Sequence, residues 1–423
     1  MTYQELSQEE LLKIKAELVD EYEKFKARGL KLDMSRGKPS SEQLDLSMDI
    51  LDPAYIADAK AQDGVDCRNY GVPLGLPECR ELFGELLGVP ARNIIVCGNS
   101  SLNIMYDYIA QCMVSGSGGE PWMLQGKIKF LCPAPGYDRH FKVLESFGIE
   151  MITVPMLEDG PDMDIIDELI KDPSVKGMFC VPKYSNPEGK VFSPAVVRRM
   201  AGLKPAAKDF RVIWDNAYFV HDLYDTAPEL LNIFEACREF GSEDMFIEVA
   251  STSKITFPGA GVSVIAASDN NIELIKKRMG VQIICHDKLN QLRHVRYFKN
   301  ADGIKAHMKR HAAILRPKFQ AVLEKFDSEF SGLGIARWTE PQGGYFISLD
   351  VLDGCAKRVV SLCKEAGVVL TGAGAAFPYG KDPKDSNIRI APTYPSVEEL
   401  SLALELLCIC VKLAAAEKLT AQK

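Results

Sequence analysis

The chain has 423 residues, of which 47% are hydrophobic and 26% are charged. This length and composition exclude a disordered or fibrous chain and predict two or three folded domains with a sizeable core. The net charge of −8 and the pI near 5.5 argue against non-specific binding to nucleic acid or to a membrane surface. No overall positive field is present to attract phosphates.

The pattern of cysteines and the length of the apolar stretches indicate the cellular compartment of the protein. Twelve cysteines are scattered between Cys67 and Cys410 without a CxxC pair, which predicts reduced thiols and no zinc framework. The first 26 residues are charged and helical in pattern, so neither a signal peptide nor a transit peptide is predicted. No stretch approaches 18 uninterrupted apolar residues, the length that a membrane span requires. We therefore expect a cytoplasmic protein without a membrane partner.

The N-terminal segment begins with a predicted helix and continues into two glycine-containing loops. Apolar residues at helical spacing over Ser7–Arg28, followed by Gly29, predict the helix. The loop Arg36-Gly37-Lys38-Pro39-Ser40 places two cations around a glycine, which suits either a surface turn or a site for a small anion. Tyr70 lies in a second loop, from which its hydroxyl could reach a polar ligand.

The middle of the chain alternates short apolar strands with helical segments. Seven strands are predicted, at Ile94–Cys97, Ile128–Leu131, Met151–Val154, Met178–Val181, Val212–Trp214, Met245–Val249 and Val262–Ala266. Their continuous hydrophobicity predicts a largely parallel sheet with helices on both faces, as in a doubly wound α/β fold. After the first strand, Asn99, Ser100 and Ser101 open a helix, whose start is either an ordinary cap or a phosphate site.

Polar residues follow four of these strands, where ligands bind in parallel sheets. They are Tyr137, Asn186, the pair Asp215 and Tyr218, and Lys254. Each of them could instead have a purely structural role. Tyr137 could be a surface ring, Asn186 part of a turn, Asp215 a helix cap and Lys254 a solvated amine. Desolvation of Lys254 would lower its pKa and make the amine available for Schiff-base chemistry. Ser251 and Ser253 beside it supply hydroxyls of the kind that a phosphate needs.

The last 120 residues or so follow a different pattern. A long helix is predicted over Lys305–Phe326, and strands are predicted near Arg337 and Tyr345. A further strand carries Arg389, and an amphipathic helix is predicted over Val397–Lys418. The segment Gly372–Phe377 is a partial GxGxxG motif that lacks the third glycine, so it is a weak dinucleotide fingerprint.

The ordered set of motifs from Ser35 to Arg389 resembles the class I/II aminotransferases of the fold-type I pyridoxal-phosphate family. The chain is most similar to the aspartate aminotransferases with an N-terminal Arg-Gly-Lys-Pro-Ser pattern, here Arg36–Ser40. The resemblance implies an N-terminal arm at residues 1–50, which joins the small domain. It also implies a large α/β domain with a mostly parallel seven-stranded sheet at 51–300 and a small α+β domain at 301–423.

The resemblance implies that the cofactor is pyridoxal 5′-phosphate and that Lys254 is its Schiff-base lysine. Lys254 would also act as the general acid and base that moves the substrate proton. Asp215 would pair with the pyridinium nitrogen, and Asn186 and Tyr218 would donate hydrogen bonds to the ring 3-oxygen. Tyr137 would stack on the ring.

The resemblance also implies binding roles around the cofactor. The phosphate would be bound by Asn99, Ser100, Ser101, Ser251 and Ser253, with Tyr70 of a second subunit, in a homodimer with shared active sites. Arg389 would clamp the substrate α-carboxylate. Asn186, Arg36 and Gly37 would also bind the substrate, and Gly37 would let the N-terminal segment close over it. No metal is implied. Val262 stands where many family members carry a phosphate-binding arginine, so Arg68, Lys183 or additional hydrogen bonds must replace it.

These observations predict an aminotransferase that acts on aspartate, or on another acidic amino acid, with 2-oxoglutarate. A distal carboxylate needs a cation, for which Arg36, Lys38 and Arg139 are the candidates. One alternative keeps the cofactor and breaks a different bond, as in a β-lyase or a decarboxylase. The other is a non-catalytic nucleotide-binding α/β protein, which the partial glycine motif alone supports.

Overall fold

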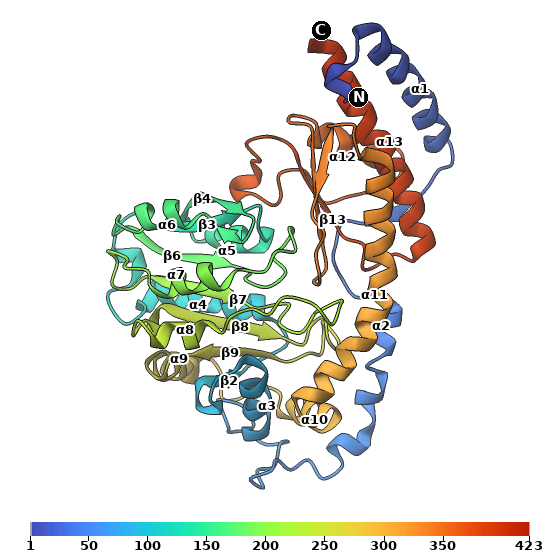
Figure 1. Ribbon diagram of the computed structural model, residues 1–423. Helices are drawn as coiled ribbons and strands as arrows, with labels where there is room; N and C mark the ends of the chain where they lie inside the picture. Colours follow the sequence, from blue (N-terminus) through green and yellow to red (C-terminus); the bar gives the residue numbers. More distant parts are fainter. Residues whose placement is uncertain (1, 423) are drawn as a thin grey trace.

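An eight-stranded sheet forms the middle of the computed structural model, which describes residues 2–422 (Figure 1). Its strand order is β2-β9-β8-β7-β6-β3-β4-β5. In that order the strands span Ile94–Val96, Ser263–Ala267, Phe246–Ser251, Arg211–Asp215, Val175–Cys180, Lys129–Ala134, Glu150–Leu157 and Gly160–Pro161. The run from β8 to β4 is parallel, whereas β9 and β5 are antiparallel to their neighbours.

All seven predicted strands are present in this sheet, so the prediction of a mostly parallel α/β sheet is confirmed. The eighth strand, β5, was not predicted because it has two residues and pairs only with the end of β4. Burial explains why the central strands were easy to find. Every residue of β6, β7 and β8 is buried, whereas in β4, near the edge, only Met151 and Val154 are buried.

Helices cover both faces of the sheet (Figure 1). One face packs against α4 (Ser101–Ser115), α5 (Asp138–Ser146) and α9 (Asp269–Gln282). The opposite face packs against α3 (Pro77–Leu87), α6 (Met163–Leu169), α7 (Pro194–Ala201), α8 (Ile233–Arg238) and α10 (Lys288–Phe298). Each face therefore has its own apolar core, which buries the central strands β6, β7 and β8 completely.

A third core joins the two ends of the chain. It combines an antiparallel sheet, β10-β11-β13, with the helices α1, α11, α12 and α13. The strands span Ala336–Trp338, Ile347–Val351 and Asn387–Ile390, and the helices span Gln8–Lys26, Ala301–Phe330, Ala356–Glu365 and Val397–Gln422. The short strand β1 (Leu32–Asp33) pairs with β12 (Val368–Val369), and the short helix α2 (Ser41–Asp45) follows it.

Two of the predicted helices differ from expectation. Helix α11 begins before the predicted residue and has 30 residues, which makes it about 45 Å long, and it runs past both sheets in Figure 1. Helix α13 was predicted to be amphipathic, which is wrong. Its apolar residues are buried around most of its circumference because α1, α11 and α12 all pack against it.

Three further properties concern the whole of the described chain. No helix within residues 2–422 is both long and apolar enough to cross a membrane. All twelve cysteines are free thiols, and every one except Cys285 is buried. The same residues contain no group of three or more His, Cys, Asp or Glu side chains that could hold a metal ion.

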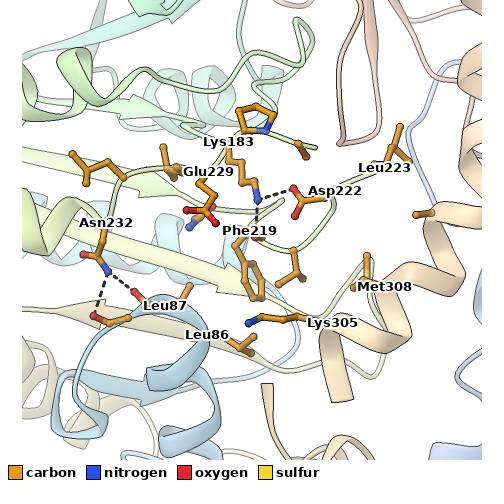
Figure 2. A pocket seen from close by; sticks show the side chains of 18 of the residues that line it. Leu86, Leu87, Lys183, Phe219, Asp222, Leu223, Glu229, Asn232, Lys305 and Met308 are labelled. Carbon is orange, nitrogen blue, oxygen red and sulfur yellow. Dashed lines mark hydrogen bonds and ion pairs between the residues drawn. The ribbon is translucent and has the colours of Figure 1, made fainter. Parts of the chain in front are cut away.

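A cavity of about 590 Å³ lies between the carboxyl end of the sheet, the end of α3 and helix α11 (Figure 2). Figure 2 shows Lys183 directed at Asp222, and the Nζ–Oδ1 distance is 2.7 Å. Glu248 of β8 also lines the cavity, and its Oε1 accepts a hydrogen bond of 2.8 Å from Asn216 Nδ2. Burial raises the pKa of Glu248 to about 7.

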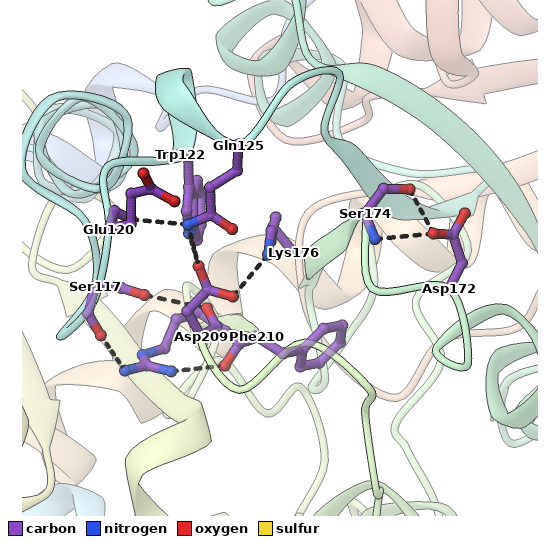
Figure 3. A network of polar contacts seen from close by, with 10 residues as sticks. Ser117, Glu120, Trp122, Gln125, Asp172, Ser174, Lys176, Asp209 and Phe210 are labelled. Carbon is purple, nitrogen blue, oxygen red and sulfur yellow. Dashed lines mark hydrogen bonds and ion pairs between the residues drawn. The ribbon is translucent and has the colours of Figure 1, made fainter.

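The amino end of the same sheet is closed by a buried polar network (Figure 3). The Asp209 carboxylate accepts hydrogen bonds from Trp122 Nε1 at 2.9 Å, Gln125 Nε2 at 2.9 Å and Lys176 Nζ at 2.8 Å. Arg211 donates to the carbonyl oxygens of Ser117 and Phe210. Burial opposes ionisation of Asp209, but the hydrogen bonds from Lys176 and Gln125 hold its pKa below the ordinary value.

Glu248→Gln is expected to stabilise the protein in a pH-dependent way. The folded-state pKa of about 7 lies above the unfolded value of 4.5, so wild-type stability falls as the pH rises through this window. The glutamine does not titrate. The free energy of unfolding of the variant should therefore rise relative to wild type by up to about 3 kcal/mol between these pH values. Denaturant unfolding at pH 4.5, 6 and 8 measures the difference, and a difference that does not change with pH would contradict the assignment.

Asp209→Asn is expected to reduce the free energy of unfolding by about 2–4 kcal/mol at neutral pH, because it leaves the buried Lys176 ammonium unpaired. A carboxylate with a lowered pKa stabilises the fold above its unfolded pKa, so the deficit should shrink as the pH falls below 3.8. Asp172→Asn is the matched control. It breaks the Lys129–Asp172 pair at the same end of the sheet, whose side chains are 30% and 42% exposed, and should cost below about 1 kcal/mol. Equal losses in the two variants would contradict the buried-pair interpretation.

Candidate functional site

Lys254 lies three residues beyond the end of β8, at the carboxyl edge of the sheet. Its side chain is half-buried and forms no ion pair with any residue of the described range 2–422. The Nζ lies 5.0 Å from the ring centre of Tyr218 and 5.8 Å from that of Tyr345. Desolvation lowers the pKa of Lys254, and the charge of Asp215 only partly opposes that shift. The amine is therefore more readily deprotonated than a lysine in water.

The backbone around Lys254 is held from several elements. Thr252 begins a turn in which its carbonyl accepts from the N–H groups of Ile255 and Thr256. The Ile255 carbonyl lies 3.0 Å from His307 Nε2 of α11 and accepts from Ser47 Oγ at 3.2 Å. The Tyr345 hydroxyl reaches the Lys254 carbonyl at 3.5 Å. The amine therefore extends from a fixed backbone.

Asp215 is the last residue of β7 and is buried. Its Oδ2 lies 2.9 Å from His140 Nε2, and the His140 ring stacks on Phe179 at 4.5 Å. The other oxygen, Oδ1, is buried and has no hydrogen-bond partner within residues 2–422. A buried carboxylate oxygen in this state costs free energy unless a ligand donates to it. Asp215 is thus oriented by a histidine and presents one acceptor to the site.

Aromatic rings and an amide surround these two charged groups. Burial raises the pKa of Tyr218 well above its ordinary value, so its hydroxyl remains protonated and can donate. Tyr137 follows β3, and burial raises its pKa to about 12. Its ring meets His140 edge-on at 5.0 Å. Asn186, which follows β6, is buried, and its Oδ1 accepts from Arg389 Nη1 at 3.3 Å.

The start of α4 forms a cradle together with the serines near Lys254. Ser100 caps the helix, and its hydroxyl accepts from Asn103 N–H. Ser251 Oγ donates to Ser253 Oγ at 3.1 Å, and Ser253 Oγ donates to the Asn99 carbonyl at 2.9 Å. The first N–H groups of a helix have no partner within the helix and attract anions. Hydroxyl groups and a helix N-terminus thus meet at a place suited to a phosphate.

The residues considered as replacements for the missing arginine are engaged elsewhere. Val262 is buried in the core on the α3 side of the sheet. Arg68 Nη2 pairs with Asp66 at 2.6 Å on the surface. Lys183 is bound to Asp222 and donates to the Phe219 carbonyl at 3.2 Å, in the cavity of Figure 2. Neither cation is therefore available at the α4 cradle in this structure.

Arg389 lies on β13 and is 9% exposed. Its guanidinium lies 5.0 Å from the ring centre of Phe346. Gly37 packs directly against this ring, since a Cβ at Gly37 would fall 2.4 Å from Phe346 Cζ. The glycine thus lets the N-terminal segment approach the Phe346 ring closely. Thr371 Oγ1 donates to the Ser35 carbonyl at 2.6 Å and anchors the same segment.

Other predicted residues do not contact this cluster within the chain. Tyr70 is 76% exposed, in a loop whose carbonyls at Asn69 and Gly71 accept from Lys288 Nζ. Arg36 and Arg139 are exposed. The Lys38 ammonium lies 3.8 Å from the ring centre of Tyr394.

Sequence reasoning missed several residues that the fold places in the site. His140 forms a hydrogen bond with Asp215. Asp138 and Thr371 contact Arg389. Tyr345 lies near Lys254, and Phe346 lies near Arg389. Asp138 and His140 stand one and three residues after Tyr137, which had been predicted as a site residue. Their nearness to Tyr137 in the sequence could have identified them. Tyr345 and Phe346 come directly before β11, where a strand had been predicted near Tyr345.

The cluster fits a cofactor that carries an aldehyde, a ring nitrogen and a phosphate, which describes pyridoxal phosphate. The unpartnered Asp215 oxygen suits a protonated ring nitrogen, and the α4 cradle suits the phosphate. The partial glycine motif offers no comparable site. Gly372–Phe377 forms a turn that leads only into the three-residue 3-10 helix Pro378–Gly380, and Gly374 adopts a φ of 85° there, so the nucleotide-binding alternative loses its support.

Comparison with known proteins agrees with this geometry. A family model described as aspartate amino-transferase matches residues 6–423. The aspartate aminotransferase of Corynebacterium glutamicum is 48% identical over 398 residues, which cover 94% of this chain and 92% of that protein. The crystal structure of an aspartate transaminase from Corynebacterium glutamicum has a TM-score of 0.97 at 46% identity and covers 99% of each chain.

A more distant structure shares the fold. The α-aminoadipate aminotransferase of Thermus thermophilus, solved with N-(5′-phosphopyridoxyl)-L-leucine, has a TM-score of 0.73 at 21% identity and covers 94% of this chain and 96% of that one. At this low identity the structure shows a common fold only, whereas the family model matches residues 6–423. This protein therefore belongs to the aspartate aminotransferase family.

Proposed function

We propose that this protein is a pyridoxal-phosphate-dependent aminotransferase that transfers the amino group of aspartate to 2-oxoglutarate. One observation carries the proposal. The desolvated amine of Lys254 and the unpartnered oxygen of Asp215 lie at the same end of one sheet. Family membership and relatives named aspartate aminotransferase support this activity. The motif at Arg36–Ser40 further suggests the branch of the family to which the chain belongs.

Pyridoxal phosphate, when bound, supplies an electron sink for the negative charge that develops at the substrate Cα. Asp215 Oδ1 would accept the ring N–H and favour the protonated ring, while His140 fixes Oδ2. Tyr218 and Asn186 would hydrogen-bond to the ring oxygen. Tyr137 would pack against the ring face.

Lys254 would hold the cofactor covalently and then carry the proton that leaves the substrate Cα. Both tasks require a neutral amine, which desolvation favours. The clamped backbone would limit the positions that Nζ can reach, which favours the reacting geometry.

Asn99, Ser100, Ser101, Ser251 and Ser253 would bind the phosphate. The exposure of Tyr70 supports a role in a second copy of the chain, so we propose a homodimer with shared active sites. We also propose that residues 51–300 form the large domain and that residues 1–50 join the small domain, residues 301–423. A cytoplasmic location accords with the free thiols.

Arg389 would bind the substrate α-carboxylate, since a guanidinium can bind both carboxylate oxygens at once. Arg36, Lys38 and Arg139 are the cations available for a distal carboxylate. Gly37 would allow the N-terminal segment to close over the substrate.

Lys254→Ala is expected to lower kcat for aspartate and 2-oxoglutarate by more than about 100-fold, because no other amine can carry the Cα proton. Lys305→Ala is the matched control. Lys305 lines the cavity of Figure 2, so its removal alters that cavity and should leave kcat unchanged. Retained activity in Lys254→Ala, or lost activity in Lys305→Ala, would contradict the placement of the active site.

The products separate this function from its alternatives. Transamination of aspartate yields oxaloacetate and glutamate and consumes 2-oxoglutarate. A decarboxylase would instead release carbon dioxide, and a β-lyase would release ammonia, in both cases without 2-oxoglutarate. Measurement of all four products from wild-type holoenzyme therefore tests the assigned reaction.

A further inference from the structure

Arg389 holds an ion pair that the proposed reaction does not explain. Its Nη1 donates to Asp138 Oδ1 at 3.0 Å and to Asn186 Oδ1 at 3.3 Å. The Asp138 side chain is 28% exposed and the Arg389 side chain 9%. A partly buried pair with this geometry is a charge-assisted hydrogen bond that fixes the orientation of the guanidinium plane.

The remaining N–H groups of Arg389 are less engaged. Nη2 donates to Thr371 Oγ1 at 3.3 Å. Nε is buried and has no hydrogen-bond partner within residues 2–422. The covalent geometry of a guanidinium places the Nε hydrogen and one Nη2 hydrogen parallel on one edge, where they match the two oxygens of a carboxylate. Asp138 and Asn186 bind Nη1 and not this edge, on which Nη2 donates to Thr371 and Nε has no partner within residues 2–422.

We propose that Asp138 is a positioning residue for substrate binding. It anchors the Nη1 side of Arg389, so that the edge formed by Nε and Nη2 faces the α-carboxylate of both the amino-acid and the 2-oxo-acid substrate. This inference rests on the proposed function, in which Arg389 binds that carboxylate. Asp138 is the first residue of α5, so the backbone of that helix holds the carboxylate in place beside Arg389.

A second carboxylate near a carboxylate-binding arginine could instead oppose binding, through repulsion or through competition for the guanidinium. The two effects have opposite signs. If Asp138 positions Arg389, its neutralisation weakens substrate binding. If Asp138 competes with substrate, its neutralisation strengthens binding. The contact geometry favours positioning, because Asp138 binds Nη1 and does not occupy the Nε–Nη2 edge.

Asp138→Asn in the holoenzyme tests the sign. The KM values for aspartate and for 2-oxoglutarate should both rise about 10-fold, as expected for the loss of one charge-assisted hydrogen bond, while kcat changes by less than about 3-fold. The inhibition constant of succinate, which has carboxylates but no amino group, should rise by a similar factor. Asp138→Glu retains the charge and should restore part of the affinity. It also keeps the proposal testable if the asparagine variant does not fold.

Asp269→Asn is the matched control. Asp269 is the first residue of α9 and pairs with Arg92 Nε at 3.3 Å on the surface, so its loss should leave every KM unchanged. Unchanged or lower KM values in Asp138→Asn would overturn the proposal while leaving the proposed function intact. A wild-type holoenzyme that neither transaminates aspartate nor binds succinate would overturn the proposed function itself.

Discussion

Desolvation of one amine at the end of a parallel sheet is the constraint on which the site depends. A lysine in water is protonated at neutral pH and is a poor nucleophile. Lys254 differs because rings and packed backbone exclude water from its Nζ, while the charge of Asp215 opposes the shift only in part. The Lys254 carbonyl accepts a hydrogen bond from the Tyr345 hydroxyl, and the Ile255 carbonyl contacts His307 of α11. Helix α11 is therefore linked by a hydrogen bond to the backbone beside the reactive amine.

The topology of the sheet explains how distant segments of the chain meet. Because β3, β6, β7 and β8 run parallel, the residues that follow them lie along one edge. Tyr137, Asn186, Asp215 and Lys254 follow these strands in turn. The antiparallel sheet then brings Arg389 to the same edge from more than 130 residues beyond Lys254. Each polar group has a supporting partner, such as His140 for Asp215 and Phe346 for Arg389.

The sequence alone predicted the elements that follow from local pattern. Seven apolar strands and the residues after them were found because buried parallel strands are continuously hydrophobic. Contacts set by packing could not be predicted. His140 meets Asp215 across 75 positions, and Asp138 meets Arg389 across 251. The error at α13 has the same origin, since its burial on several sides depends on helices from both ends of the chain. Tyr70 shows the complementary limit, because it is exposed in the single chain and the role that we propose for it depends on a second copy.

The most direct test of the account identifies the lysine that binds the cofactor. The purified protein would be incubated with pyridoxal phosphate and reduced with borohydride, which converts a lysine–aldehyde linkage into a stable amine. The modified residue would then be located by peptide mass spectrometry. The account predicts a single modified residue, Lys254, and loss of the modification when aspartate is added before reduction. Labelling of Lys183 or Lys305 in the neighbouring cavity, with Lys254 unmodified, would contradict it.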